Sequence, residues 1–263
     1  MDQTVMTDSV KVLRDGAVAE IVLNEPQSMN ALSAGIKAGL ETHLPAVLDD
    51  PAVRAVILTG TGRAFCAGGD IRAMDDRGAV SVRDRMERSY RWLAPLLNAG
   101  KPIVTAINGA AAGAGLSLAL TGDVVIASRD ARFKAGFPGL GAVADLGLGY
   151  TLTRAVGHVR ASDILLTNRE VAAEEAFAMG LASRLVDAAD LMATARQVAA
   201  GLAAGPTVSL GMTKRLLRRA YDLPLEAYLE EEGLAQVLCF GSDDFAEGVA
   251  AFKGKRKPEF RGR

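Results

Sequence analysis

Short apolar segments alternate with segments of helical periodicity, and this alternation limits the fold of the chain more than any other feature. Residues 54–59, 102–107 and 124–127 are apolar runs of strand length, and residues 78–99 have a helical pattern. A strand buried on both faces of a sheet is continuously apolar, and intervening helices allow neighbouring strands to pair in parallel. The sequence therefore predicts an α/β fold with a mainly parallel sheet.

The longest uncharged segment, residues 102–122, approaches the length of a membrane span, which needs about 20 apolar residues. It also contains Asn108, Thr105, Ser117 and four glycines, which are not typical of a span. We interpret it as a buried strand, a turn and a helix of small residues, and we expect no contact with a membrane.

The N-terminal part has the pattern of a hairpin followed by a helix. Residues 10–14 and 18–23 flank Asp15-Gly16, a pair that favours a tight turn. Ser33 is a good N-cap for a helix that extends to about residue 48.

Helical periodicity dominates the last quarter of the chain, where Pro206 and Pro224 separate the segments. We expect an α/β core of residues 1–205 and a C-terminal helical region of residues 206–263. The predicted helices are 191–204, 208–220, 225–240 and 244–253.

The charge and the cysteine content exclude several classes of protein. Lys and Arg total 30 and Asp and Glu total 31 among 263 residues, so the basic excess typical of a nucleic-acid partner is missing. Two cysteines and two histidines support neither a disulfide framework nor a histidine-rich zinc site, and we expect no metal. Residues 1–10, MDQTVMTDSV, lack the apolar core of a signal peptide, which favours a cytoplasmic protein.

Two glycine turns are candidates for binding an anion. Gly68-Gly69-Asp70 and Gly113-Ala114-Gly115 each lie between a strand pattern and a helical pattern. Backbone N–H groups at the start of a helix lack intrahelical acceptors, and two such turns can direct two donors at one developing oxyanion. The alternative is that both are ordinary turns, and spacing alone does not distinguish the two interpretations.

Two other motifs carry weaker signals. Gly60-Thr-Gly62 follows a strand but lacks the third glycine and the helix of a dinucleotide fingerprint. Ser117 lies in Gly-Leu-Ser-Leu-Ala, without the glycine spacing of a nucleophile elbow, and a small buried serine explains it better.

Asp145 is the lone carboxylate of residues 141–149, a segment rich in glycine and apolar residues. An acid in apolar surroundings has a raised pKa and is suited to proton transfer. The alternative is that Asp145 caps a helix of residues 146–156.

The basic residues between 253 and 263 indicate a solvated tail or a contact with phosphates.

Several segments, taken in order along nearly the whole chain, resemble the enoyl-CoA hydratase/isomerase (crotonase) superfamily. They are RAFCAGGDIR (63–72), KPIVTAINGAAAGAG (101–115), TGDVVIA (121–127), AAEEAFAMGL (172–181) and FKGKRKPEF (252–260).

The resemblance implies a crotonase-like fold of repeated ββα units with a C-terminal helical trimerisation region, in homotrimers or in hexamers formed as dimers of trimers. It implies acyl-CoA substrates, with coenzyme A as part of the substrate and no separate cofactor. The matching positions for the oxyanion hole are the N–H groups of Gly69 and Ala114. Ala114 replaces a usual glycine, and an alanine holds a positive φ less easily. The residues implied to line CoA or the acyl group are Arg63, Ala67, Gly69, Asp70, Ile71, Arg72, Ala114 and Phe137, with Phe252 and Lys255 of a neighbouring subunit.

The acids depart from the pattern of the hydratases in this superfamily. The two glutamates that hold water in those enzymes fall at Ser117 and Phe137, and neither is a carboxylate. Asp145 follows Phe137 by eight residues, the spacing of a catalytic aspartate in some isomerases and in aryl-CoA dehalogenases. Tyr90 stands where the dehalogenases have a histidine. We therefore favour an enoyl-CoA isomerase with Asp145 as proton carrier and Phe137 as a wall of the acyl pocket.

Other functions stay open at this point. One alternative is weak hydratase, CoA thioester hydrolase or decarboxylase activity that uses the same oxyanion hole. The other is a protein without catalysis that binds acyl-CoA or RNA, because a fold does not determine a function. The near-neutral charge argues against RNA.

Overall fold

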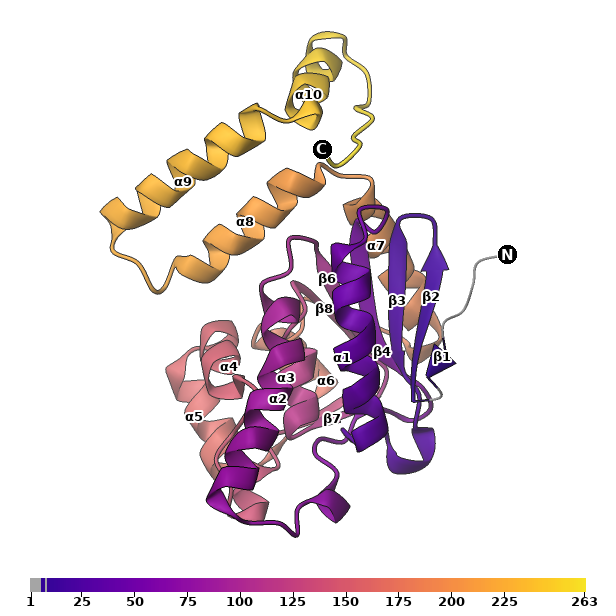
Figure 1. Cartoon of the computed structure of the whole chain (residues 1–263), viewed down its shortest axis with the longest axis vertical. Helices are drawn as coiled ribbons and strands as arrows, with labels where there is room; N and C mark the ends of the chain where they lie inside the picture. The colour runs from indigo at the N-terminus through magenta and orange to yellow at the C-terminus, as the bar shows by residue number, and fades with distance from the viewer. Residues whose placement is uncertain (1–5, 8) are drawn as a thin grey trace.

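The structure is a computed structural model that describes residues 6–7 and 9–263 (Figure 1). Most of the segment assessed above for a signal peptide, residues 1–10, lies outside the described residues. The described chain forms an α/β body with two sheets, from which a C-terminal group of helices projects (Figure 1).

The main sheet confirms the predicted parallel architecture. Pairing is antiparallel between its first three strands and parallel from β3 onward. In spatial order the strands are β1 (Met6–Thr7), β2 (Val10–Asp15), β3 (Val18–Leu23), β4 (Ala55–Gly60), β6 (Ile103–Ile107), β8 (Val124–Ser128) and β11 (Arg184–Val186).

Helices cover both faces of this sheet, which explains why its central strands are apolar at nearly every position. In β4, Val56 and Leu58 join the cluster that includes side chains of α1 (Ala34–Asp49) and α2 (Ala79–Leu97). Ala55 and Ile57 point to the other face, against α7 (Leu191–Ala203). Neighbouring side chains of a strand point to opposite faces, so both sets of residues must be apolar.

The local predictions at the N-terminus are confirmed. β2 and β3 form the expected hairpin, and Gly16 has a φ of 56° at its turn. Ser33 caps α1, where its hydroxyl oxygen accepts a hydrogen bond of 3.1 Å from the backbone N–H of Ile36.

A second, four-stranded sheet is absent from the sequence prediction. Its strands have three residues each, and those of β7 are all alanine, so neither length nor alternation indicates a strand. In spatial order they are β10 (Glu170–Ala172), β9 (Arg132–Lys134), β7 (Ala110–Ala112) and β5 (Ala64–Cys66).

The uncharged segment 102–122 forms β6, β7 and α3 (Ala114–Ala119), as the strand, turn and small-residue helix interpretation expects, with β7 as an additional strand. In the described part of the chain, no helix combines the length and the apolar character that crossing a bilayer requires. The remaining helices of the body are α4 (Leu148–Val156), α5 (His158–Thr167) and α6 (Ala173–Ala178).

The C-terminal arm, residues 206–263, contains α8 (Thr207–Arg219), α9 (Leu225–Phe240) and α10 (Asp243–Lys253). These helices lie within one residue of the predicted segments. The arm follows α7, the last helix that packs on the main sheet, and extends away from the body (Figure 1).

Candidate functional site

The two glycine turns lie side by side at one edge of the small sheet. β5 and β7 pair in parallel, so the turns that follow them leave the sheet at the same edge. A Cβ on Gly68 would lie 2.7 Å from the carbonyl oxygen of Ala112 and 3.5 Å from the amide nitrogen of Ala114. Gly68 also has a φ of 103°, a conformation that favours glycine. Tertiary structure thus brings together two turns that are distant in the sequence.

The amides of Gly69 and Ala114 are available to a ligand. Within residues 6–7 and 9–263, neither N–H donates a hydrogen bond to the backbone or to a side chain. Ala114 begins α3, and the first amides of a helix have no intrahelical acceptor. Two such donors beside each other are able to stabilise an oxyanion.

Ala114 does not have the positive φ that is typical of a glycine, the residue that is usual at this position in the family. It has the conformation of a helical residue, while Gly113 before it has a φ of 54°. The turn therefore retains its glycine where the positive φ occurs, and the alanine keeps the N–H in place.

Asp145 lies in the loop before α4, next to the start of α3. The Ser117 hydroxyl on α3 donates a hydrogen bond of 2.9 Å to the Asp145 carbonyl oxygen, which also accepts from the N–H of Leu148. The carboxylate oxygen Oδ1 is buried and has no hydrogen-bond partner among the described residues. An unpartnered buried carboxylate is destabilising, and such groups are typical of functional sites.

The helix-cap interpretation of Asp145 is wrong. α4 begins at Leu148 instead of residue 146, and its N-cap is Gly147, with no side-chain cap. Leu146 has a φ of 49°, so the helix cannot begin there. The side chain of Asp145 is therefore not committed to the helix.

Burial raises the pKa of the Asp145 carboxyl, and the positive charges of Lys37 and Arg85 oppose this rise in part. Lys37 belongs to α1 and Arg85 to α2. The same burial lowers the pKa of the Lys37 ammonium. Neither cation is predictable from the sequence as part of the site, because nothing in the local pattern of Lys37 or Arg85 distinguishes it from residues of a solvated helix face.

The two positions where hydratases have glutamates are buried and lack a carboxylate. Ser117 is 1% exposed, and the acceptors of its hydroxyl are the backbone carbonyl oxygens of Asp145 and Gly113. These contacts support the interpretation of Ser117 as a buried packing residue and not as a nucleophile. Phe137 is 7% exposed and belongs to the main core cluster together with Ala114.

The segment after Gly69 forms a polar surface turn. The Asp70 carboxylate accepts hydrogen bonds from the backbone N–H and the guanidinium of Arg72, and the ion pair lowers the pKa of Asp70. Ile71 and Arg72 are exposed, as is Arg63 before β5. The N–H of Ala67 is occupied by a hydrogen bond to the carbonyl oxygen of Met29.

Two predicted binding residues are far from the glycine turns of their own chain. Phe252, which is 87% exposed, and Lys255 belong to the end of the C-terminal arm, whereas α3 lies deep in the body (Figure 1).

Tyr90 lies on α2 and is 46% exposed. The dinucleotide interpretation of Gly60-Thr-Gly62 fails, because strand β5 follows instead of a helix.

The comparison with known proteins covers nearly the whole chain. The sequence profile described as enoyl-CoA hydratase/isomerase matches residues 14–263. A 1,2-epoxyphenylacetyl-CoA isomerase of Escherichia coli strain K12 is 39% identical over 250 residues, which cover 94% of this chain and 95% of that protein. A probable enoyl-CoA hydratase of Rhodobacter capsulatus is also 39% identical, over 94% of this chain and 95% of its own.

The solved structures agree with this similarity. A crystal structure of an enoyl-CoA hydratase/isomerase from Cupriavidus metallidurans aligns with a TM-score of 0.92 and 32% sequence identity. The alignment covers 98% of this chain and 97% of the other.

Proposed function

Because the chain belongs to the enoyl-CoA hydratase/isomerase family and has its crotonase-like fold, we propose that it is an isomerase that moves a double bond in an acyl-CoA. The observation that carries this proposal is the acid–base content of the site. Asp145 lies near the oxyanion turns, and its buried oxygen Oδ1 has no hydrogen-bond partner among the described residues, while Ser117 and Phe137 occupy the positions of the hydratase glutamates.

In the proposed reaction, the Asp145 carboxylate removes a proton from the carbon α or γ to the thioester carbonyl. The electron pair of that C–H bond moves into the conjugated system, and the thioester oxygen becomes the oxygen of a dienolate. The N–H groups of Gly69 and Ala114 hold this oxygen. Protonated Asp145 then returns the proton to the other end of the system, so the double bond moves and no atom is gained.

Hydration fits this site less well than isomerisation. Adding water requires a base for the water molecule and an acid for the α-carbon. A single carboxylate performs both halves of a proton shuttle, but it does not hold water between two acids. The similarity to a 1,2-epoxyphenylacetyl-CoA isomerase supports the choice, although a relative of equal identity is named as a probable hydratase.

Mass spectrometry in heavy water tests this proposal. The protein is incubated with a 3-enoyl-CoA, beside an Asp145→Asn variant whose circular dichroism matches that of the wild type. We expect movement of the double bond and deuterium uptake without a gain of water. The variant should lose about 100-fold or more of the rate, within the usual range for a catalytic acid–base group.

Three outcomes would contradict the proposal. Full activity of the Asp145→Asn protein would exclude Asp145 as the proton carrier. A mass gain of one water molecule in the wild type would show a hydratase in which another group activates water. Free CoA or carbon dioxide as a product would identify a hydrolase or a decarboxylase.

The same proposal includes substrate binding and assembly. We propose that the turn from Gly69 to Arg72 lines the CoA arm, and that Phe252 and Lys255 reach a site in a neighbouring subunit. We propose a homotrimer, alone or paired into a hexamer, because the arm exposes large apolar side chains that include Leu234 and Val237. Sedimentation of a monomer at micromolar concentration would contradict this assembly.

A further inference from the structure

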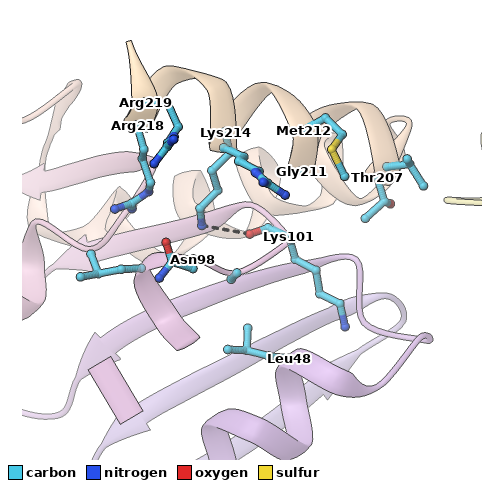
Figure 2. Close-up of a pocket in the computed structure, with 14 residues that line it drawn as sticks. Leu48, Asn98, Lys101, Thr207, Gly211, Met212, Lys214, Arg218 and Arg219 are labelled. Carbon is cyan, nitrogen blue, oxygen red and sulfur yellow. Dashed lines mark hydrogen bonds between the residues drawn. The ribbon is translucent and has the colours of Figure 1, made fainter. Parts of the chain in front are cut away.

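A cleft of about 740 Å³ lies between α8 of the C-terminal arm and the ends of α1 and α2 (Figure 2). Its volume is within the range of about 300–1,000 Å³ that is usual for small-molecule sites. Leu48 in the last turn of α1 and Leu97 at the end of α2 line one side, and α8 lines the other. The glycine turns and Asp145 are not among the residues that line it, so this cleft is separate from the proposed active site.

The wall formed by α8 is strongly basic. Lys214, Arg215, Arg218 and Arg219 line the cleft, and Lys101 lines it from the loop before β6. None of the residues that line it is an aspartate or a glutamate. Like charges three or four residues apart on a helix repel one another, so this face of α8 is destabilised unless anions compensate it.

Three of these cations already have partners in the described chain. Lys214 forms an ion pair of 2.8 Å with Asp123. Arg219 forms one of 2.7 Å with Glu231 on α9. The Lys101 ammonium donates to backbone carbonyl oxygens at the end of α1.

The other two cations are not compensated in this way. The Arg215 side chain makes no hydrogen bond or ion pair among the described residues. The Nε of Arg218 is buried and lacks a hydrogen-bond partner in the described chain. The carboxylate whose charge acts on Arg218, Asp123, already pairs with Lys214, and burial lowers the pKa of the Arg218 guanidinium. Two guanidinium groups on neighbouring turns of one helix are thus left to an external anion.

We propose that this cleft binds a phosphorylated small molecule with an apolar body, of the class of a nucleoside diphosphate. The planar fork of donors on arginine matches the oxygens of a phosphate, and the spacing of Arg215 and Arg218 suits two adjacent phosphates. Leu48, Leu97 and Met212 supply apolar surface for the body of the ligand. The ligand neutralises the basic face of α8 and joins the arm to the body.

Calorimetric titration with ADP as the probe tests the site, together with hydrogen exchange of residues 207–219. The test variant is Arg215→Gln/Arg218→Gln. The control, Arg83→Gln/Arg91→Gln, removes the same charge from exposed positions of α2. We expect ADP to protect α8 from exchange, and we expect the test variant to weaken its affinity by about tenfold or more. The control should keep its affinity within about twofold.

Two results would overturn the proposal. An ADP affinity that is equal in the test variant and the wild type would place the nucleotide elsewhere, including the proposed acyl-CoA site. Dissociation of a larger assembly by the test variant, without a change in ADP binding, would show that a second copy of the chain fills the cleft. Neither result depends on the isomerase assay, so this proposal and the proposed function fail separately.

Discussion

At Asp145, the requirements of catalysis and of folding oppose each other. A base that is poised for proton transfer must be ionised near its target, but an ionised carboxylate that is buried without a partner destabilises the fold. The Ser117 hydrogen bond goes to the Asp145 backbone, and the carboxylate oxygen Oδ1 has no partner among the described residues. The site therefore retains its reactive group at some cost in stability.

The first prediction is that Asp145→Asn removes activity and stabilises the protein. The folded-state pKa of Asp145 is raised above the ordinary value of 3.8, so the cost in folding free energy grows as the pH rises past 3.8 and is complete above the raised pKa. Below 3.8 the cost disappears. We expect the variant to gain about 1 kcal/mol at pH 8, the order of a buried unsatisfied polar group, and nothing near pH 4. Thermal melts across pH check this sign, and a destabilised variant at pH 8 would contradict it.

A second prediction concerns Lys37, whose positive charge opposes the rise of the Asp145 pKa. Removing that charge raises the Asp145 pKa further. In Lys37→Met, we expect the acid limb of kcat/KM to move to higher pH, with activity kept on the alkaline side. Lys37→Arg, the matched control, should keep the wild-type limb. A lower rate at every pH with an unmoved limb would assign Lys37 a purely structural role.

At the scale of elements, the oxyanion turns depend on the close packing of α3 against β5. Gly115 makes this approach possible, because a Cβ there would overlap the carbonyl oxygen of Cys66. The helix start that presents the Ala114 N–H is thus positioned by contact between backbones and not by a side chain.

A third prediction follows from this contact. Gly115→Ala should destabilise the protein by about 1–3 kcal/mol, the usual cost of overpacking, and should lower kcat by displacing the Ala114 amide. Gly201→Ala in α7 is the control, since a Cβ at Gly201 meets nothing within 4 Å. That change should stabilise the protein by about 0.5–1 kcal/mol. Urea unfolding measures both, and equal effects of the two changes would refute the packing argument.

At the scale of the whole molecule, the arrangement of body and arm depends on Arg54, which directly precedes β4. Its guanidinium donates hydrogen bonds of 2.9 Å to the Thr207 hydroxyl and to the carbonyl oxygen of Phe260, and another to the carbonyl oxygen of Gly205. Asp244 on α10 binds the same tail through the N–H groups of residues 261 and 262. The last residues of the chain thereby return to the body.

The fourth prediction is that Arg54→Ala loosens this junction. We expect faster hydrogen exchange in residues 205–210 and 258–263, and a loss of about 1–3 kcal/mol in the free energy of unfolding, because three hydrogen bonds from a charged group are removed. Arg83→Ala removes an exposed pair with Glu87 on α2 and should change stability by less than about 0.5 kcal/mol. Unchanged exchange at both segments of the Arg54 variant would contradict this role.

The sequence by itself determined the architecture of the body and the family. β4, β6 and β8 are covered on both faces, so burial requires apolar residues at nearly every position, and this requirement is visible as an apolar run. The N-cap role of Ser33 and the turn at Gly16 were equally predictable, because helix caps and tight turns depend on residues that are close in the sequence. The resemblance, not the periodicity, connected Gly69 with Ala114.

Only the tertiary structure decided how the site and the arm are composed. The small sheet that aligns the glycine turns has strands of three residues, too short to leave a pattern in the sequence. The charge of Lys37 on α1 and the hydroxyl of Ser117 on α3 both act on Asp145, which belongs to a third segment. The N-cap of α4 is Gly147 and not Asp145. Each of these features depends on contacts between segments far apart in the chain. Local sequence does not encode such proximity, because packing of the complete fold produces it.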